Sequence, residues 1–109
     1  MDKLFIKPIY LEMVQTIFKK HCPNVKVLAY GSRVNGNDYT AHSGSDLDLA
    51  IEGLENEAIS IFELKEFFQE SNIPFFVDAF DLSLLPQSFH KEIAKNNIEI
   101  FPNFRGEYV

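Results

Sequence analysis

Short strand-like segments alternate with longer segments of helical period along most of this chain, and that alternation limits the folds open to it. Apolar residues recur at helical spacing in the longer segments, whereas the strand-like segments are apolar or alternate polar with apolar residues. Chains with this pattern fold as an α/β (α+β) domain, in which helices cover a sheet. The predicted helices span residues 9–22, 56–71 and 86–97, and the predicted strands span residues 25–30, 45–52, 75–80 and 98–101.

The length suits one domain. Of the 109 residues, 46% are hydrophobic and 24% are charged, which is enough for a single core and leaves no room for a second domain. We therefore expect residues 1–109 to form one domain, with residues 102–109 as a loosely held tail. Cys22 is the only cysteine, which excludes an intrachain disulfide. The first residues lack the apolar run of a secretory signal, so we expect a soluble cytoplasmic protein with no membrane span.

The net charge of −6 bears on the partners that the chain can hold. Proteins that grip DNA or RNA by its backbone use clustered Lys and Arg, so this charge argues against direct polynucleotide binding. The same charge is compatible with a nucleoside triphosphate that arrives with its own Mg²⁺, and with a partner protein that has a basic surface.

Two aspartates on the second predicted strand are candidate metal ligands. Asp46 and Asp48 are two residues apart, so in a strand both side chains point to one face, while Leu47 and Leu49 point into the core. Neighbouring carboxylates repel each other unless a cation lies between them, and Mg²⁺ prefers such hard oxygen ligands. Asp78 lies in a strand that can run alongside and supplies a third carboxylate. Three carboxylates on one face suit a two-metal phosphoryl or nucleotidyl transfer.

A Gly-Ser pair after the first predicted strand is a candidate phosphate-binding turn. Gly31 allows the backbone to approach a phosphate closely, and the Ser32 hydroxyl and backbone N–H groups can donate to its oxygens. Arg33 is a further candidate for nucleotide binding, although an exposed arginine is the commoner interpretation at such a position. Taken separately, Gly-Ser turns and Asp-x-Asp strands are more often structural, and only their order and strand contexts favour a function.

Other residues compete for a role in this site. Asp81 competes with Asp78, but three residues along a strand reverse the face, so we expect Asp81 to be a strand-end or capping residue before Ser83. Three histidines have no ligand spacing to one another, which argues against a zinc site: His21, His42 and His90.

Residues 31–36 (GSRVNG), 45–50 (SDLDLA) and 77–81 (VDAFD) together resemble the minimal nucleotidyltransferases of the DNA polymerase β superfamily. The resemblance covers nearly the whole chain and implies a mixed sheet with helices packed mainly on one face. It implies ATP or another nucleoside triphosphate as substrate and two Mg²⁺ ions as cofactor. One departure is a longer segment around residues 39–44, which we interpret as a longer loop at the mouth of the site. The implied site residues are Gly31 and Ser32 for the phosphates, and Asp46, Asp48 and Asp78 as metal-binding and catalytic carboxylates.

The same resemblance bears on the partner. Minimal nucleotidyltransferases often act beside a small helical protein of the HEPN type, as the antitoxin of a toxin–antitoxin pair. They neutralise that toxin by transferring AMP from ATP to a tyrosine hydroxyl, or by binding it. Two hypotheses therefore stand, an active enzyme and a catalytically silent binding module that masks its partner. The retained carboxylates favour the enzyme, while Phe104 and Tyr108 in the tail indicate contact with a partner or a second copy of the chain.

Overall fold

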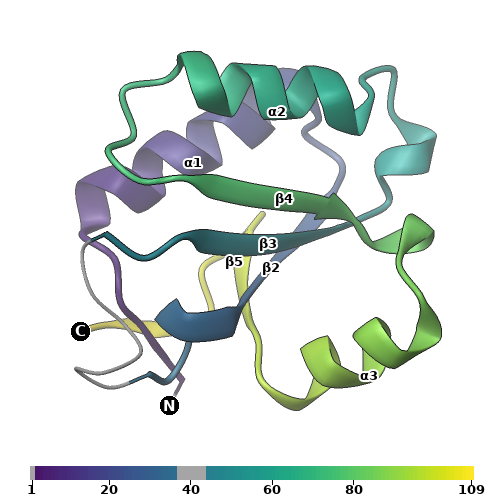
Figure 1. Ribbon diagram of the computed structural model, residues 1–109. Coiled ribbons are helices and arrows are strands. Elements are labelled where there is room, and N and C mark those ends of the chain that lie inside the picture. The colour runs from purple at the N-terminus through teal and green to yellow at the C-terminus, as the bar shows by residue number, and fades with distance from the viewer. Residues whose placement is uncertain (1, 37–43) are drawn as a thin grey trace.

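The computed structural model describes residues 2–36 and 44–109, where helices and strands alternate as the sequence predicts (Figure 1). Within these ranges no helix is both long enough and apolar enough to cross a membrane. Short 3-10 turns include η1 (Gly31–Arg33) and η3 (Leu82–Leu84). The α-helices are α1 (Pro8–His21), α2 (Ile61–Glu70) and α3 (Gln87–Lys95). The strands are β1 (Lys3–Leu4), β2 (Lys26–Tyr30), β3 (Leu47–Glu52), β4 (Val77–Asp81), β5 (Ile98–Phe101) and β6 (Glu107–Tyr108).

The main sheet has the strand order β4-β3-β2-β5 and is mixed, as the resemblance implies. β3 and β4 run parallel, whereas β2 is antiparallel to both of its neighbours. Parallel neighbours need a crossover connection, and α2 supplies it between β3 and β4. This connection places the start of β4 beside the start of β3, which is where the sequence has its aspartates.

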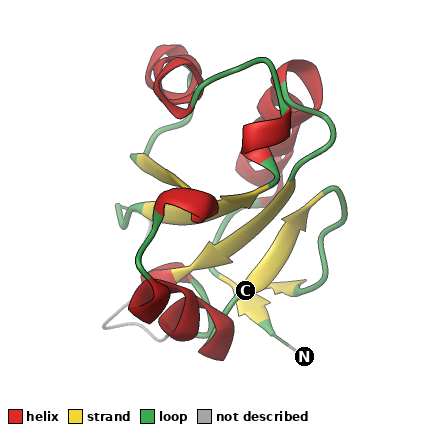
Figure 2. Ribbon diagram, turned by 90° about the vertical axis from the view of Figure 1, so that its right-hand side faces the viewer, coloured by secondary structure: helices red, strands yellow, loops and turns green. Residues whose placement is uncertain are grey.

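Alternation along β3 decides which face of the sheet is buried. Leu47, Leu49 and Ile51 have no exposed surface, whereas Asp48 and Glu52 belong to the opposite set of alternating positions. α1 and α2 lie over the apolar face, and α3 lies on the other side of the sheet (Figures 1 and 2). The helices therefore pack mainly on one face. The aspartate face is left on the side where α1 and α2 do not cover it.

α2 begins later than the sequence pattern predicts. The prediction placed a helix at residues 56–71, but the helix spans Ile61–Glu70, and Ser60 is its N-cap. The Ser60 Oγ accepts a hydrogen bond from the Glu63 backbone N–H at 3.2 Å, and the Glu63 side chain accepts from the Ser60 N–H at 3.2 Å. This reciprocal capping box satisfies helix-end donors and stops the helix there. The apolar pattern extends to residues before the observed start of α2, because a pattern of apolar residues carries no information about the N-cap at Ser60.

The C-terminal segment is held to the N-terminal one, so the prediction of a loosely held tail is wrong. β6 pairs in parallel with β1, with the Glu107 N–H donating to the Asp2 carbonyl at 2.9 Å and the Val109 N–H donating to the Leu4 carbonyl at 3.2 Å. Phe104 packs against the core, and its ring centroid lies 4.8 Å from that of Tyr108. Sequence analysis missed this strand because a two-residue strand carries no detectable periodicity.

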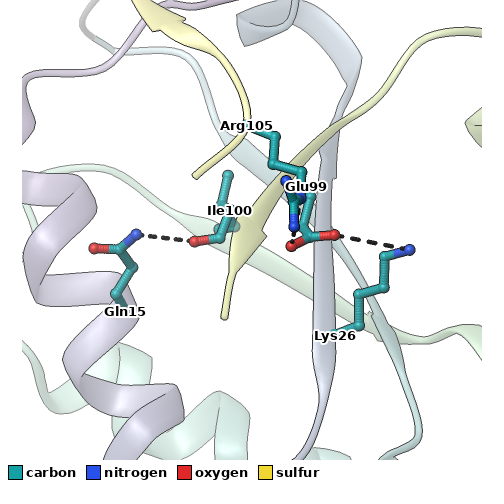
Figure 3. Close-up of polar contacts among 5 residues, drawn as sticks. All are labelled: Gln15, Lys26, Glu99, Ile100 and Arg105. Carbon is teal, nitrogen blue, oxygen red and sulfur yellow. Dashed lines mark hydrogen bonds and ion pairs between the residues drawn. The ribbon is translucent and has the colours of Figure 1, made fainter. Parts of the chain in front are cut away.

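Side chains from three other segments form polar contacts with β5, which is one of the two edge strands of the main sheet (Figure 3). Gln15 of α1 donates its side-chain N–H to the Ile100 carbonyl at 2.9 Å. Glu99, which is largely buried, forms ion pairs with Lys26 at 3.8 Å and with Arg105 at 3.3 Å. These contacts join α1, β2 and the C-terminal segment to one strand.

Candidate active site

Strand pairing brings two of the predicted carboxylates side by side. In the parallel register of β3 and β4, Asp48 pairs with Asp78, and in the antiparallel register of β2 and β3, Asp48 pairs with Tyr30. The side chains of directly paired residues share one face of a sheet. Tyr30, Asp48 and Asp78 therefore form a row across three strands, on the face opposite the α1–α2 core. The sequence-based prediction that the Asp78 strand lies beside the Asp48 strand is confirmed.

Gly31 marks the abrupt turn at the end of β2. Its φ is +80°, a left-handed conformation that glycine adopts without steric penalty, and η1 begins at this residue. A side chain at position 31 would collide with the Asp48 carboxylate, because the first atom that a β-carbon there would meet is Asp48 Oδ2. The Val34 N–H closes η1 by donating to the Gly31 carbonyl at 3.1 Å. The turn therefore lies directly against the carboxylate row, with Ser32 half-buried beside it.

Electrostatics at this row are strongly negative. Burial, and then the charges of Asp78 and Asp46, raise the pKa of Asp48 from an ordinary 3.8 to about 6. Burial, and then the negative charges of Asp48 and Asp78, raise the pKa of Tyr30 to about 12. Both shifts show that the site disfavours additional negative charge. A cation placed among these groups would relieve the repulsion.

Asp46 does not share the strand position that the sequence analysis gave it. The predicted strand began at residue 45, but β3 begins at Leu47, so Asp46 precedes the strand and is exposed. Burial still alternates across this boundary, with Ser45 and Leu47 buried and Asp46 exposed, and the Asp46 charge contributes to the raised pKa of Asp48. Among residues 2–36 and 44–109, no three His, Cys, Asp or Glu side chains are arranged to hold a metal ion. The oxygen donors of Asp46, Asp48 and Asp78 still suit a hard divalent cation, although they are not gathered as a finished three-ligand site.

Residues 12–104 match the family described as "Polymerase beta, Nucleotidyltransferase". The chain belongs to this family. It is also 39% identical over 96 residues to the Haemophilus influenzae (strain ATCC 51907 / DSM 11121 / KW20 / Rd) protein named "Probable protein adenylyltransferase MntA". That match covers 85% of this chain and 80% of the relative. The chain is thus a nucleotidyltransferase, of the minimal type that its sequence motifs resemble.

Arg33, which we predicted to bind nucleotide, is buried in this nucleotidyltransferase, with 3% of its surface exposed. Its Nε and Nη2 donate to the Ser45 carbonyl at 2.9 and 2.8 Å, and its Nη1 donates to the Phe5 carbonyl at 2.6 Å. Burial lowers the pKa of the guanidinium, against the opposing effect of the nearby Asp46 carboxylate. Contact of Arg33 with a nucleotide stays a prediction, and the contacts described here join parts of the protein to one another.

Asp81 has the capping role that the sequence predicted. It is the last residue of β4 and the N-cap of η3, and its Oδ1 accepts from the Ser83 backbone N–H at 3.0 Å and from the Ser83 hydroxyl at 2.7 Å. A carboxylate used in this way is held at the far end of β4 from Asp78. The structure therefore favours Asp78 over Asp81 as the third carboxylate of the nucleotidyltransferase site.

The described histidines have structural contacts. The His21 ring stacks on Phe67 with 3.7 Å between centroids, and His90 Nε2 lies 3.1 Å from the Leu85 carbonyl. His42 and residues 39–43 of the predicted longer loop lie outside the described residues. The sequence does not single out Tyr30, because only the register of β2 against β3, which places Tyr30 opposite Asp48, puts the two side chains on one face.

Proposed function

We propose that this nucleotidyltransferase transfers AMP from ATP to a hydroxyl group of a partner protein in the cytoplasm. The observation that carries the proposal is the packing of the Gly31 turn against Asp48, with Asp78 paired beside it. This arrangement puts a candidate phosphate-binding turn within contact distance of paired carboxylates. Its electrostatics favour a substrate that arrives with a divalent cation.

Each residue has a defined part in the proposed reaction. The Gly31 and Ser32 backbone and the Ser32 hydroxyl would bind the triphosphate, and Asp46, Asp48 and Asp78 would hold Mg²⁺. When bound, Mg²⁺ neutralises charge on the phosphates. The acceptor oxygen forms a bond to the α-phosphorus, the bond from that phosphorus to the β-phosphate oxygen breaks, and pyrophosphate leaves. Asp78 accepts the proton of the acceptor hydroxyl.

The acceptor in this proposal is a tyrosine of a small helical HEPN-type protein, which the transfer would neutralise as a toxin. The name of the Haemophilus influenzae relative supports protein as the acceptor class, because it describes a protein adenylyltransferase. The carboxylate row lies on the face opposite α1 and α2, and Asp48 and Asp78 are each only partly buried, which supports an acceptor that approaches from solvent.

A second candidate is a silent module that neutralises a partner by masking it. Exposed apolar side chains favour this alternative, since exposed apolar surface is typical of protein contacts. Among the described residues the most exposed are Phe62 and Leu84, each with 75% of its surface accessible, followed by Val109 with 63% and Ile9 with 57%. Masking and transfer differ in one respect that can be measured, the need for Asp48.

The deciding experiment incubates the protein with ATP labelled at the α-phosphate and Mg²⁺, alone and with the protein encoded beside it. We expect label on the partner with the wild-type chain and none with Asp48→Asn. The matched control is Glu52→Gln, which removes an exposed carboxylate from the same strand and should leave labelling intact. If wild type and Asp48→Asn neutralise the partner equally and neither labels it, the protein acts by masking its partner and not by transfer.

A further inference from the structure

The Arg33 guanidinium joins three segments that are far apart in the sequence. It donates two hydrogen bonds to the Ser45 carbonyl and one to the Phe5 carbonyl. Its carbon centre also lies over the Phe75 ring, 4.1 Å from the centroid. The Arg33 backbone adds a further link, because its carbonyl accepts from the Phe5 N–H at 2.8 Å.

The Ser45 and Phe75 contacts lie close in sequence to carboxylates of the candidate active site. Arg33 is the last residue of η1, the turn that begins with Gly31 and Ser32. Ser45 immediately precedes Asp46, and Phe75 is three residues before Asp78. In addition to the pairing of β2, β3 and β4, the Arg33 side chain therefore links the candidate phosphate-binding turn to the segments that precede two of the carboxylates.

The chemistry of this contact requires arginine. A buried cation is costly unless its donors are satisfied, and here the carbonyl oxygens satisfy them. Two donors of the planar fork reach one carbonyl while the flat face stacks on an aromatic ring, which a lysine ammonium cannot reproduce. Ser45 is itself buried, with 8% of its surface exposed, so the fork and the residue that accepts its two hydrogen bonds are both buried.

We propose that Arg33 is a positioning residue for nucleotidyl transfer, which holds the Gly31–Ser32 turn at a fixed distance from Asp46 and Asp78. This inference rests on the proposed function for the reaction that it serves. It differs from the role suggested by the sequence alone, in which Arg33 binds nucleotide directly. A positioning role and a binding role make opposite predictions for kcat and KM.

The kinetic test compares Arg33→Lys and Arg33→Met with Arg105→Met, which removes an exposed arginine paired with Glu99. For a positioning residue, kcat falls about 100-fold in Arg33→Lys and Arg33→Met, because small displacements of reacting groups have effects of that size. The KM for ATP and the affinity for a fluorescent ATP analogue stay close to wild type, and Arg105→Met leaves kcat unchanged. A rise in KM at constant kcat, or full activity in Arg33→Lys, would overturn the inference.

A second measurement uses the unaltered protein and does not depend on the variants folding. In a crystal structure with a non-hydrolysable ATP analogue and Mg²⁺, a positioning Arg33 keeps its bonds to the Ser45 carbonyl and has no phosphate oxygen within hydrogen-bond distance. A guanidinium bonded to phosphate would overturn the inference. Absence of transfer by the wild-type protein would count against the proposed function instead, while the crystal structure and the analogue affinities would still decide whether Arg33 contacts nucleotide.

Discussion

Gly31 lies against the carboxylate of Asp48 with no room for a side chain between them. The φ of Gly31 is +80°, and its chain neighbour Tyr30 is directly opposite Asp48 on β3. Two requirements therefore meet at position 31, a left-handed backbone and an absent β-carbon. Gly53 has the first requirement without the second, since its φ is +92° and nothing lies within 4 Å of where a β-carbon would be. The chain thus contains its own control for separating backbone strain from collision.

Gly31→Ala should lower both activity and stability. Left-handed backbone in a non-glycine residue costs roughly 1–2 kcal/mol, and Gly53→Ala should show that loss of unfolding free energy alone. Gly31→Ala should lose more, because the added methyl group also displaces Asp48, and AMP transfer should fall with it. Denaturant unfolding and labelled-ATP assays on both variants provide the measurement. Equal losses of stability in the two variants, with transfer intact, would contradict the close packing of Gly31 on Asp48.

The raised pKa of Asp48 makes the stability of the metal-free protein depend on pH. The folded state binds the Asp48 proton with a pKa of about 6, above its ordinary 3.8, so folded protein loses stability as the pH rises between these values. Above pH 6 the ionised carboxylate should destabilise the fold by about 1–3 kcal/mol. Asp48→Asn carries no such charge, and it should be more stable than wild type at pH 7.5 and closer to wild type near pH 4.

Urea unfolding of wild type and Asp48→Asn in the presence of a chelator, at pH 4 and pH 7.5, measures this difference. The prediction concerns how the difference in unfolding free energy between the two proteins changes from pH 4 to pH 7.5. If the difference in unfolding free energy between the two proteins were the same at both pH values, burial and the neighbouring carboxylates would not raise the pKa of Asp48. Adding Mg²⁺ and ATP at pH 7.5 should raise the unfolding free energy of the wild type toward that of Asp48→Asn, since a bound cation offsets the repulsion among the carboxylates.

Substitutions at Asp78 and Asp81 should have different effects, the first on transfer and the second on stability. Asp78→Asn should reduce transfer by about 100-fold or more, the range found for loss of an acid–base group. Asp81→Ala should leave kcat unchanged and lower the unfolding free energy by about 1 kcal/mol, because it removes the cap of η3 at Ser83. Steady-state transfer rates and denaturant unfolding on the two variants are the measurements. Loss of transfer in Asp81→Ala at full stability would reverse the assignment of the third carboxylate.

Deleting residues 107–109 should destabilise the protein. The deletion removes the bond from the Glu107 N–H to the Asp2 carbonyl and the bond from the Val109 N–H to the Leu4 carbonyl. At about 0.5–1.5 kcal/mol net for each bond, the expected loss is roughly 1–3 kcal/mol. Leu4 also bridges to Val34, which follows η1, so transfer should weaken as well. An unchanged midpoint in thermal or urea unfolding would show that the pairing of β6 with β1 contributes nothing to stability.

Most of the elements were predictable because they are long enough to show a period. α1 and β5 agree with their predicted ranges to within one residue, and Asp81 has its predicted cap. The errors fall where periodicity carries no information. Ser60 starts α2 through a reciprocal pair of hydrogen bonds, and β6 is too short to be visible as a pattern. Local hydrogen bonding and pairing between chain ends decided both features.

By itself, the sequence determined the order of the motifs, the strands that carry Asp48 and Asp78, and the turn at Gly31. These follow from residue type and spacing, which act over a few neighbouring positions. Only the tertiary structure decided that Asp46 lies outside β3, that the tail pairs with β1, and that Arg33 is buried against Ser45 and Phe5. Each of these depends on contacts between segments distant in the chain, and no local pattern of residues encodes which of them meet.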